Sequence, residues 1–373
     1  MKIAVNTRLL IENKLDGIGW FTYETLKRIT QKHKDVEFLF LFDRPYSESF
    51  IFSSNITPLV TGPPARHPFL WYYWFEKSVP EIIKQAKPDL FLSPDGYLSL
   101  STNVPSVPII HDINFYHRPK DLPYLKRKYY QYYFPKFAKK AVRIGTVSNY
   151  SKQDITNSYN INPDKIDVMY NGANATYNPI NETQKKASRE KYASGHDYFI
   201  FIGNLHPRKN VGRLLKAFDE FKKEIKREFK LVIVGGRFFK TGEIKESFRN
   251  LKYKEDIIFT GRLSPGDLKE VLGAATALTF VPIFEGFGIP NIEAMYCDVP
   301  VITSNETSIP EVVGDAALLV NPFSINEIKE AMIKIWEDEN LRSRLIERGR
   351  KRREIYSWEN TADNLWKCIE KSI

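Results

Sequence analysis

Short hydrophobic runs alternate with longer amphipathic stretches through most of the chain. Hydrophobic runs bounded by turn residues are typical of strands buried in a parallel sheet, and amphipathic stretches between them are typical of helices. In the first half, the predicted strands are 2–6, 36–42, 89–93, 107–111, 143–147 and 166–170. The predicted helices there are 19–32, 76–87 and one that Asn149 or Ser151 caps and that runs to Tyr159.

The same alternation begins again in the second half. The predicted strands are 198–203, 230–235, 256–261, 277–281 and 299–303, and the predicted helices are 211–228, 242–251, 265–272 and 290–296. The remaining chain is predicted to form helices over 325–337 and 342–353 and a last helix from Ser357-Trp358. Two open α/β sheets in series are the simplest fold that accounts for this order of elements.

The segment 171–195 separates the two halves. It is polar, contains Asn171-Gly172 and Asn178-Pro179, and lacks a sustained hydrophobic period, as is typical of an interdomain linker. We therefore place the domain boundary near Tyr177.

Composition and charge limit the class of protein. A chain of 373 residues with 42% hydrophobic and 27% charged residues is globular and long enough for about two domains. The two cysteines, Cys297 and Cys368, fit a reducing compartment, and the first hydrophobic run is too short for a signal peptide, so we expect a cytoplasmic protein. A net charge of +10 favours a polyanionic partner such as a phosphorylated molecule, an anionic lipid surface or nucleic acid.

A glycine-rich motif at 284–295 is the densest chemical signal. Gly286 and Gly288 allow the backbone to approach a ligand closely, and Pro290 suits the start of a helix. The free N–H groups at a helix start favour an anion such as phosphate. The motif therefore predicts a phosphate-binding loop.

Two carboxylates belong to the same motif. Glu285 lies in the loop and Glu293 in the expected first turn of the helix, so both can face one pocket. Carboxylates accept hydrogen bonds only, and they pair naturally with sugar hydroxyls. The motif alone leaves an alternative open, in which a glycine turn precedes a helix whose glutamate merely complements the helix dipole.

A second motif, GNLHPRKN at 203–210, follows the first strand of the second half and precedes a helix. Arg208 and Lys209 thus lie at the carboxyl end of a strand, where open α/β sheets bind ligands. Arginine offers a bidentate fork and lysine a point charge to a diphosphate. A solvated Arg-Lys pair is the alternative, but a second phosphate-type loop on the same predicted sheet favours a site.

These two motifs resemble the donor site of retaining glycosyltransferases of family 4, which have the GT-B fold. The specific parts are the setting E-G-F-G-x-P-x-x-E-A-M and the lysine. Supporting motifs run the length of the chain: Gly17 and Gly19, His111-Asp112, Thr146-Val147-Ser148 with Ser151, Asn171-Gly172, Val299-Pro300-Val301-Ile302, Glu311-Val312-Val313-Gly314, and Trp358 at the start of the last helix.

The resemblance implies two Rossmann-like domains whose parallel sheets face each other across a deep cleft. Residues 1–176 would bind the acceptor, and the C-terminal helix 358–373 would pack back on this domain. Residues 177–357 would bind a nucleoside diphosphate sugar. The motif at 203–210 together with His-Asp is similar to mannosyltransferases of surface polysaccharide assembly, which makes GDP-mannose the first expected donor and a UDP-hexose the second.

Carried over to this sequence, the resemblance implies that Glu285 contacts the donor sugar and Glu293 the ribose, while Arg208 and Lys209 neutralise the diphosphate. Asn204 stands where many relatives have arginine, so Arg208 would supply that charge. The further implied donor-binding residues are Gly17, Gly19, Gly203, Asn204, Leu263, Gly286, Phe287, Gly288 and Ile289.

His111 would act across the cleft, near the donor sugar. Without the resemblance, the favoured explanation for a lone histidine after a hydrophobic run is a hydrogen-bonded residue that closes a strand.

The expected chemistry needs no metal ion. Cleavage of an anomeric bond to a diphosphate creates an oxocarbenium-like centre, and fixed positive charge at the phosphates stabilises the leaving group. The sequence contains no Asp-x-Asp motif, so we expect neither a metal ion nor another cofactor. The resemblance implies retention by front-face attack, with the leaving phosphate oxygen deprotonating the acceptor.

Residues 118–143 combine basic and aromatic side chains with a single acid, Asp121. Such a helix suits the interface of an anionic membrane, and a second aromatic run at 71–75 could dock an acceptor or a lipid. The alternative is a helix whose aromatic face packs on its own sheet. We therefore expect a cytoplasmic protein, with peripheral binding to the inner face of the plasma membrane as a further expectation and a lipid-linked oligosaccharide as acceptor.

Two other classes of protein remain open to test. A non-catalytic membrane- or nucleic-acid-binding protein on the same fold would bind vesicles or oligonucleotides in a salt-dependent way, with no effect of Glu285→Ala. No nucleic-acid-binding signature accompanies the basic segment, so nucleic acid is not an expected partner. A dinucleotide-dependent oxidoreductase is disfavoured because Thr22 stands where the third glycine of its fingerprint belongs. The sequence does not specify the oligomeric state.

Overall fold

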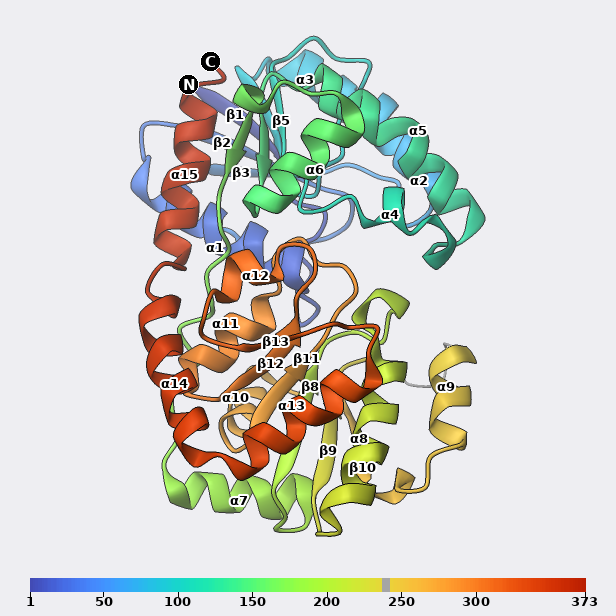
Figure 1. Cartoon of the computed structure of the whole chain (residues 1–373). Coiled ribbons are helices and arrows are strands. Elements are labelled where there is room, and N and C mark those ends of the chain that lie inside the picture. Colours follow the sequence, from blue (N-terminus) through green and yellow to red (C-terminus); the bar gives the residue numbers. More distant parts are fainter. Residues whose placement is uncertain (237–241) are drawn as a thin grey trace. The chain divides into compact units, whose positions relative to one another are not determined.

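The structure is a computed structural model of the whole chain, and it describes residues 1–236 and 242–373 (Figure 1). The chain forms two compact units, Met1–Gly172 with Ser357–Ile373, and Ala173–Tyr356. The division at Gly172 falls a few residues before the boundary predicted near Tyr177.

The first unit is built on a five-stranded parallel sheet in the order β3-β2-β1-β4-β5. Apart from the exposed Glu37 at the start of one strand, two of its central strands are buried, as their continuous hydrophobic sequences require. The strands are β1 (Lys2–Asn6), β2 (Glu37–Phe42), β3 (Ile56–Val60), β4 (Leu90–Ser93) and β5 (Ser106–Pro108), followed by the parallel pair β6 (Ile144–Thr146) and β7 (Ile166–Val168).

Helices connect these strands. The α-helices of the first unit are α1 (Gly17–Lys32), α2 (Pro68–Tyr73), α3 (Val79–Ala86), α4 (Asn114–His117), α5 (Tyr124–Lys140), α6 (Asn149–Tyr159) and α15 (Trp358–Glu370). A π-helical turn, η2 (Trp74–Ser78), joins α2 to α3, and short 3₁₀ turns are η1 (Glu48–Phe50), η3 (Pro119–Asp121) and η4 (Pro163–Lys165).

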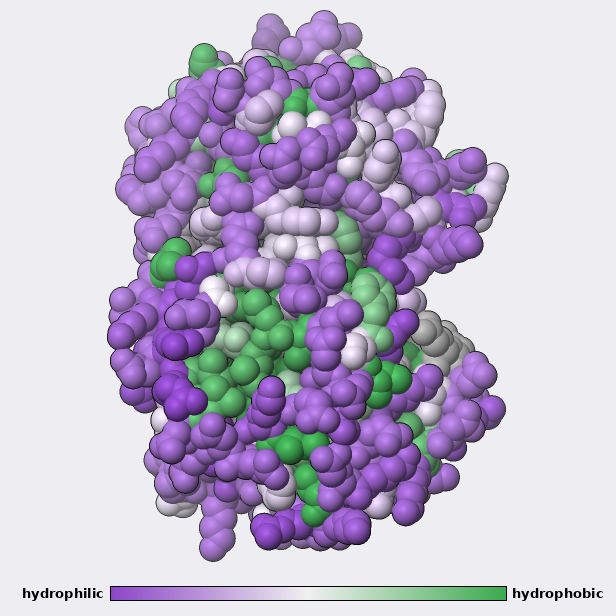
Figure 2. All heavy atoms as spheres, in the orientation of Figure 1, coloured by the Kyte–Doolittle hydropathy of each residue, from purple (hydrophilic) through white to green (hydrophobic). Residues whose placement is uncertain are grey.

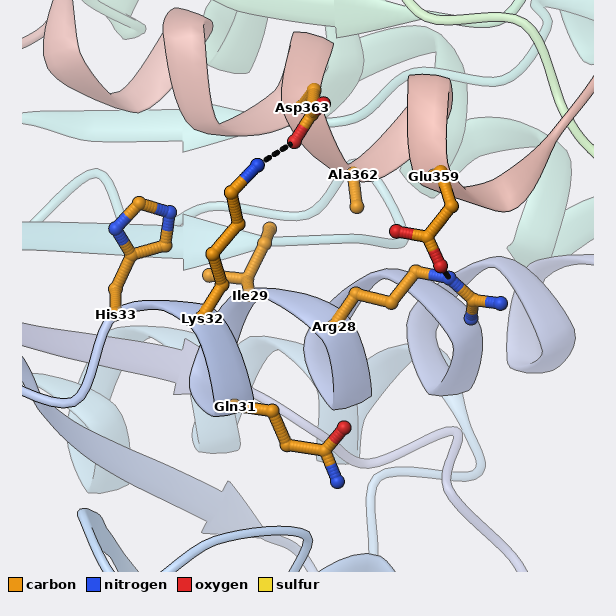
Figure 3. Close-up of a pocket in the computed structure, with 8 residues that line it drawn as sticks. All are labelled: Arg28, Ile29, Gln31, Lys32, His33, Glu359, Ala362 and Asp363. Carbon is orange, nitrogen blue, oxygen red and sulfur yellow. Dashed lines mark hydrogen bonds and ion pairs between the residues drawn. The ribbon is translucent and has the colours of Figure 1, made fainter.

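The last helix, α15, belongs to the first unit and packs on α1. Ion pairs join Arg28 to Glu359 and Lys32 to Asp363, each at 2.6 Å, beside an open pocket of about 270 Å³ (Figure 3). The start of α15 approaches the backbone of residue 172 closely, which only glycine allows there. A Cβ on Gly172 would lie 2.4 Å from the backbone nitrogen of Trp358. None of the residues that line this pocket is a predicted site residue.

The second unit contains a six-stranded parallel sheet in the order β10-β9-β8-β11-β12-β13 (Figure 1). The strands are β8 (Tyr198–Ile202), β9 (Lys230–Val234), β10 (Ile257–Gly261), β11 (Ala277–Phe280), β12 (Val301–Ser304) and β13 (Leu318–Val320). The helices are α7 (Glu182–Ala193), α8 (Val211–Ile225), α9 (Gly242–Arg249), α10 (Pro265–Gly273), α11 (Ile289–Tyr296), α12 (Ile309–Val313), α13 (Ile325–Glu337) and α14 (Glu339–Arg353), with 3₁₀ turns η5 (Pro207–Lys209) and η7 (Lys254–Asp256).

The prediction of two parallel-sheet α/β domains is confirmed, and several local predictions are wrong. The predicted linker contains helix α7, which opens with a capping box between Asn181 and Gln184. Strands β3 and β13 and the short helix α12 were not predicted. The strand predicted over 107–111 ends at Pro108, so His111 lies beyond it.

Candidate functional site

The chain changes direction in the second sheet between β8 and β11. From β8 it builds outward to β9 and β10, and from β11 it builds the other way to β12 and β13. The loops after β8 and β11 therefore diverge at the carboxyl edge of the sheet, where doubly wound folds bind ligands. Both predicted motifs, 203–210 and 284–295, follow these two strands.

Hydrogen bonds hold the two loops together. The backbone nitrogen of Ile283 donates to the Arg208 carbonyl at 2.8 Å. Asn210, which has a left-handed backbone with φ of 62°, donates from Nδ2 to the carbonyls of Val281 (3.1 Å) and Pro322 (2.6 Å). The turn η5 that carries the two cations is thus fixed to the loop that carries the carboxylate.

Arg208, Lys209 and Glu285 form one charge cluster. Arg208 Nη1 and Lys209 Nζ both lie 2.5 Å from Glu285 Oε1. Arg208 Nη1 also donates to the Phe284 carbonyl at 2.9 Å, and Lys209 Nζ lies 4.8 Å from the centre of the Phe280 ring. Lys209 is 9% exposed and Glu285 7%, so Lys209 is not part of a solvated Arg-Lys pair, which was the alternative.

The main chain of Glu285 is anchored from the segment before α12. Its backbone nitrogen donates to Thr307 Oγ1 at 3.2 Å, and its carbonyl accepts from Ser308 Oγ at 2.9 Å. Neither Thr307 nor Ser308 was predicted as a site residue, and two hydroxyls in a row before a helix are too common a pattern to signal this role.

Gly288 is required where the loop enters α11. Its φ is 91°, and a Cβ would lie 2.6 Å from Ile309 Cδ1. In the part of the chain that the structure describes, no side chain caps the N-terminus of α11. Phe287 is buried against Tyr356, with ring centres 5.4 Å apart. The backbone from Gly286 to Ile289 therefore forms the helix start that the sequence predicts.

Glu293 was predicted in the first turn of α11. In the structure it lies one turn further along the helix. Its half-buried carboxylate is hydrogen-bonded to Tyr177. Burial raises the pKa of Glu293 to about 7, and the bond to Tyr177 partly opposes this shift. The structure thus places Glu285 among cations and Glu293 beside Tyr177, and no contact joins the two carboxylates among the described residues.

The end of β8 is closed by backbone packing. Gly203 has φ of 153° and donates to the Val234 carbonyl, and a Cβ on Gly235 would lie 1.7 Å from the Gly203 carbonyl oxygen. Asn204 is exposed next to it, and Leu263 is half-buried in the loop after β10. Gly235 was not predicted, although a glycine that ends a buried strand is a recognisable signal of close backbone approach.

The remaining predicted residues belong to the first unit. His111 is hydrogen-bonded through Nε2 to the Pro94 carbonyl at 2.9 Å, and burial lowers its pKa. The predicted helix 19–32 begins two residues earlier, so Gly17 and Gly19 both lie in the first turn of α1. The Gly19 nitrogen donates to the capping Asp16 side chain at 3.1 Å.

A polar network that was not predicted marks the corresponding switch point of the first sheet, between β1 and β4. Arg8 Nε lies 2.6 Å from Asp95 Oδ2, and its guanidinium stacks 4.3 Å from the centre of the Tyr97 ring. Asn6 Nδ2 donates to Asp95 Oδ1 at 2.8 Å. The signal was present in the sequence, since polar residues lie at the ends of both strands and within two residues beyond them.

Within the described residues, no group of three or more His, Cys, Asp and Glu side chains is arranged to hold a metal ion. Searched over the same part of the chain, the helices include none that is long and apolar enough to cross a membrane.

Comparison with solved structures shows the fold. The chain aligns over 100% of its length with all of Anabaena Alr3699/HepE in complex with UDP and glucose, with a TM-score of 0.78 at 15% identity. With its two parallel-sheet Rossmann-like domains, the chain has the GT-B fold of glycosyltransferases.

Sequence comparison then gives the family. The model described as Glycosyltransferase Family 4 matches residues 15–177, and that described as Glycosyl transferases group 1 matches residues 182–352. The O-antigen chain mannosyltransferase RfbU of Salmonella typhimurium is 30% identical over 68% of this chain and 67% of its own. The O-antigen chain mannosyltransferase B of Escherichia coli is 29% identical over the same shares. The chain belongs to glycosyltransferase family 4.

Proposed function

We propose that the chain transfers a hexose from a nucleoside diphosphate sugar to a saccharide acceptor during assembly of a cell-surface polysaccharide. The observation that carries this proposal is the charge cluster of Arg208, Lys209 and Glu285 beside the glycine loop at the switch point of the second sheet. The two mannosyltransferase relatives support it, and both act on O-antigen chains by name.

GDP-mannose is the first donor we propose, because both relatives are named mannosyltransferases. A UDP-hexose is the alternative, because the structural neighbour Alr3699/HepE holds UDP and glucose. The acceptor proposed is a lipid-linked oligosaccharide.

The chemistry follows from the charges. The bond between the anomeric carbon and the phosphate oxygen breaks, and the diphosphate leaves with the electron pair. Arg208 and Lys209 stabilise the charge that develops on the diphosphate, aided by the amide groups from Phe287 to Ile289. Glu285 accepts hydrogen bonds from the sugar hydroxyls. These fixed groups supply the positive charge that a metal ion would otherwise provide, so we propose metal independence.

Retention of configuration is part of the proposal. The acceptor oxygen attacks the same face from which the diphosphate departs, and its proton passes to the leaving phosphate oxygen. Glu285 cannot serve readily as a nucleophile because two cations hold its Oε1 atom.

A transfer assay tests this function. The protein is incubated with GDP-mannose or UDP-glucose, prenyl-diphosphate-linked oligosaccharides and EDTA, and products are followed by mass spectrometry and anomeric NMR. We expect one donor to add a single hexose with retained configuration. Transfer that requires a divalent cation contradicts metal independence, and the absence of transfer and of donor hydrolysis with every donor contradicts the function.

We also propose that the first unit binds an anionic membrane surface through α2 and α5. Exposed aromatic and aliphatic side chains lie on both helices: Phe69, Leu70, Tyr72 and Tyr73 on α2, and Tyr124, Leu125 and Tyr132 on α5. We call this set the aromatic surface. Trp71 stacks on Tyr130 with ring centres 5.6 Å apart, which places α2 beside α5.

Positive charge surrounds the aromatic surface. Leu125, Lys128, Tyr132, Lys136 and Lys139 are exposed and recur at helical spacing along α5. Lys136 Nζ lies 3.4 Å from the centre of the Tyr132 ring. The acid Asp121 is paired with Arg118 at 2.6 Å. In Figure 2 the region of α5 is coloured purple and pale, as lysine and tyrosine are on this scale.

The rest of α5 supports the alternative that was left open. Tyr129, Phe134 and Phe137 are buried in the first unit, so the helix uses one face for packing and the other for the basic aromatic surface. Packing inside the first unit accounts for one face of the helix, and the proposal of membrane binding concerns the other face.

Vesicle co-sedimentation tests this part of the proposal. We expect binding to phosphatidylglycerol vesicles that weakens with added salt, and weaker binding by the variant Phe69→Ser/Tyr132→Ser. Phe323→Ser removes an aromatic side chain of the second unit that is 51% exposed, and it should bind like the wild type. Equal binding to neutral vesicles, or stronger binding to oligonucleotides, contradicts the proposal.

A further inference from the structure

Glu285 and the diphosphate need the same two cations. Arg208 Nη1 and Lys209 Nζ each lie 2.5 Å from Glu285 Oε1, and Arg208 has one further bond to the Phe284 carbonyl. All three charged side chains are largely enclosed, with side-chain exposures of 18%, 11% and 9% for Arg208, Lys209 and Glu285. In such a setting charges interact much more strongly than they do in water.

The cluster is built rather than adventitious. Bonds from Thr307 and Ser308 hold the main chain of Glu285, and the Asn210 bonds hold the turn η5 that carries both cations. A diphosphate entering the site therefore meets a fixed carboxylate among its cations. Like charges close together in a low dielectric repel each other, so the carboxylate must weaken binding of any nucleoside diphosphate.

A donor that still carries its sugar changes this balance. Sugar hydroxyls donate hydrogen bonds to a carboxylate, and bonds to an ionised acceptor are the stronger kind. Glu285 thus opposes the diphosphate in both ligands but gains hydrogen bonds only from the one with a sugar.

We infer that Glu285 is a specificity-determining residue that makes the site favour the nucleoside diphosphate sugar over the nucleoside diphosphate. Glu285 competes with the diphosphate for Arg208 and Lys209, which weakens the binding of both ligands. Hydrogen bonds from the sugar hydroxyls to Glu285 offset this loss of affinity only for the nucleoside diphosphate sugar. This inference rests on the proposed function. Its consequence is rapid release of the nucleoside diphosphate once the sugar has been transferred.

Isothermal titration calorimetry of Glu285→Gln tests the inference. The ligands are GDP, GDP-mannose, UDP and UDP-glucose. The amide keeps the size of the side chain and removes its charge, so we expect affinity for the nucleoside diphosphate to rise about tenfold or more. The affinity for the matching sugar nucleotide rises less or falls, so the preference of the wild type for the sugar nucleotide shrinks by at least about tenfold, which corresponds to about 1.4 kcal/mol.

Two further variants separate this effect from a general change in the site. In Glu285→Gln/Lys209→Met, the gain in nucleoside diphosphate affinity should shrink, because only Arg208 is then released to the diphosphate. Glu293→Gln alters a carboxylate that interacts with Tyr177 and not with the two cations. In this variant the affinities for the nucleoside diphosphate and for its sugar nucleotide should change by the same factor. Glu285→Asp retains the charge but shortens its reach, and a smaller gain in the same direction is expected if Glu285→Gln does not fold.

Two results would overturn the inference in different ways. If the wild type binds a nucleoside diphosphate and Glu285→Gln binds it equally or more weakly, Glu285 orients the cations instead of competing for them, and the proposed function stands. If the wild type binds none of the four ligands, the proposed function fails and the inference fails with it.

Discussion

At the scale of single residues, Lys209 combines a buried position with a predicted role in catalysis. Lys209→Ala leaves Glu285 paired with Arg208, so no buried charge is abandoned without a partner. We expect turnover to fall by about 100-fold or more, because a fixed cation at the leaving group is lost. Turnover at saturating donor and the thermal midpoint are measured together.

A buried lysine outside the site provides the matched control. Lys222 is 3% exposed, pairs with Asp256 at 3.0 Å and lies on α8. Lys222→Ala should lower the thermal midpoint at least as much as Lys209→Ala and retain turnover. Equal loss of turnover in the two variants would mean that Lys209 acts only through stability.

Glu293 gives the protein a specific dependence on pH. Its pKa is about 7 in the folded chain and ordinary in the unfolded chain, so the folded state holds more protons between about pH 4.5 and 7. The free energy of unfolding therefore falls as pH rises through this window, by about 3 kcal/mol at most, and is level above it.

Urea unfolding of the wild type and Glu293→Gln over this pH range checks the prediction. The difference between the two curves should follow the titration of Glu293, with the variant gaining relative stability as pH rises. Tyr177→Phe removes the bond that opposes the rise in the pKa of Glu293. The free energy of unfolding of this variant should therefore keep falling to a higher pH than that of the wild type. A constant difference between wild type and Glu293→Gln would exclude a raised pKa.

At the scale of elements, the connection from β8 to α8 positions the cations. Asn210→Ala places alanine in a left-handed backbone conformation, which alanine adopts unfavourably. It also removes the side-chain donor to the carbonyls of Val281 and Pro322. We expect a loss of about 3 kcal/mol in the free energy of unfolding, together with lower turnover. Asn210→Gly tolerates the conformation and should be about 1 kcal/mol more stable than Asn210→Ala.

Chemical denaturation and turnover of the two variants are compared with the wild type. If Asn210→Ala unfolds like the wild type, the bonds to the loop after β11 do not hold the turn.

Most elements could be predicted from hydrophobic patterning because the central strands are buried on both sides and read as continuous runs. The missed elements lack that signal for physical reasons. Helix α7 buries only Ser188 and Ala193, so it has no hydrophobic period. Strand β3 is at the sheet edge, contains Pro58 and is half exposed, and β13 is a three-residue edge strand.

The site was predictable in residue type but not in its pairing. The motifs placed Arg208, Lys209 and Glu285 on two neighbouring loops, as the structure has them. The shared contact at Glu285 Oε1 depends on the bonds of Asn210, Thr307 and Ser308, which no local pattern reveals. The separation of Glu285 from Glu293 depends in the same way on where α11 begins.

At the scale of the whole molecule, the basic residues behind the net charge of +10 include two separate groups. A small part is enclosed in the second unit at Arg208 and Lys209, which we propose bind a phosphorylated ligand. Another part is exposed on α5 in the first unit, where it faces solvent beside aromatic side chains. Ligand binding at Arg208 and Lys209 should resist added salt more than membrane binding through α5, because buried charges are screened less.

We propose above all that the second unit binds a nucleoside diphosphate sugar without a metal ion. The most direct measurement is the thermal midpoint of the protein with GDP, UDP, ADP and their sugars, with and without EDTA. We predict that one nucleotide raises the midpoint, that EDTA has no effect, and that Lys209→Ala removes most of the shift. No shift with any nucleotide at millimolar concentration would contradict the claim.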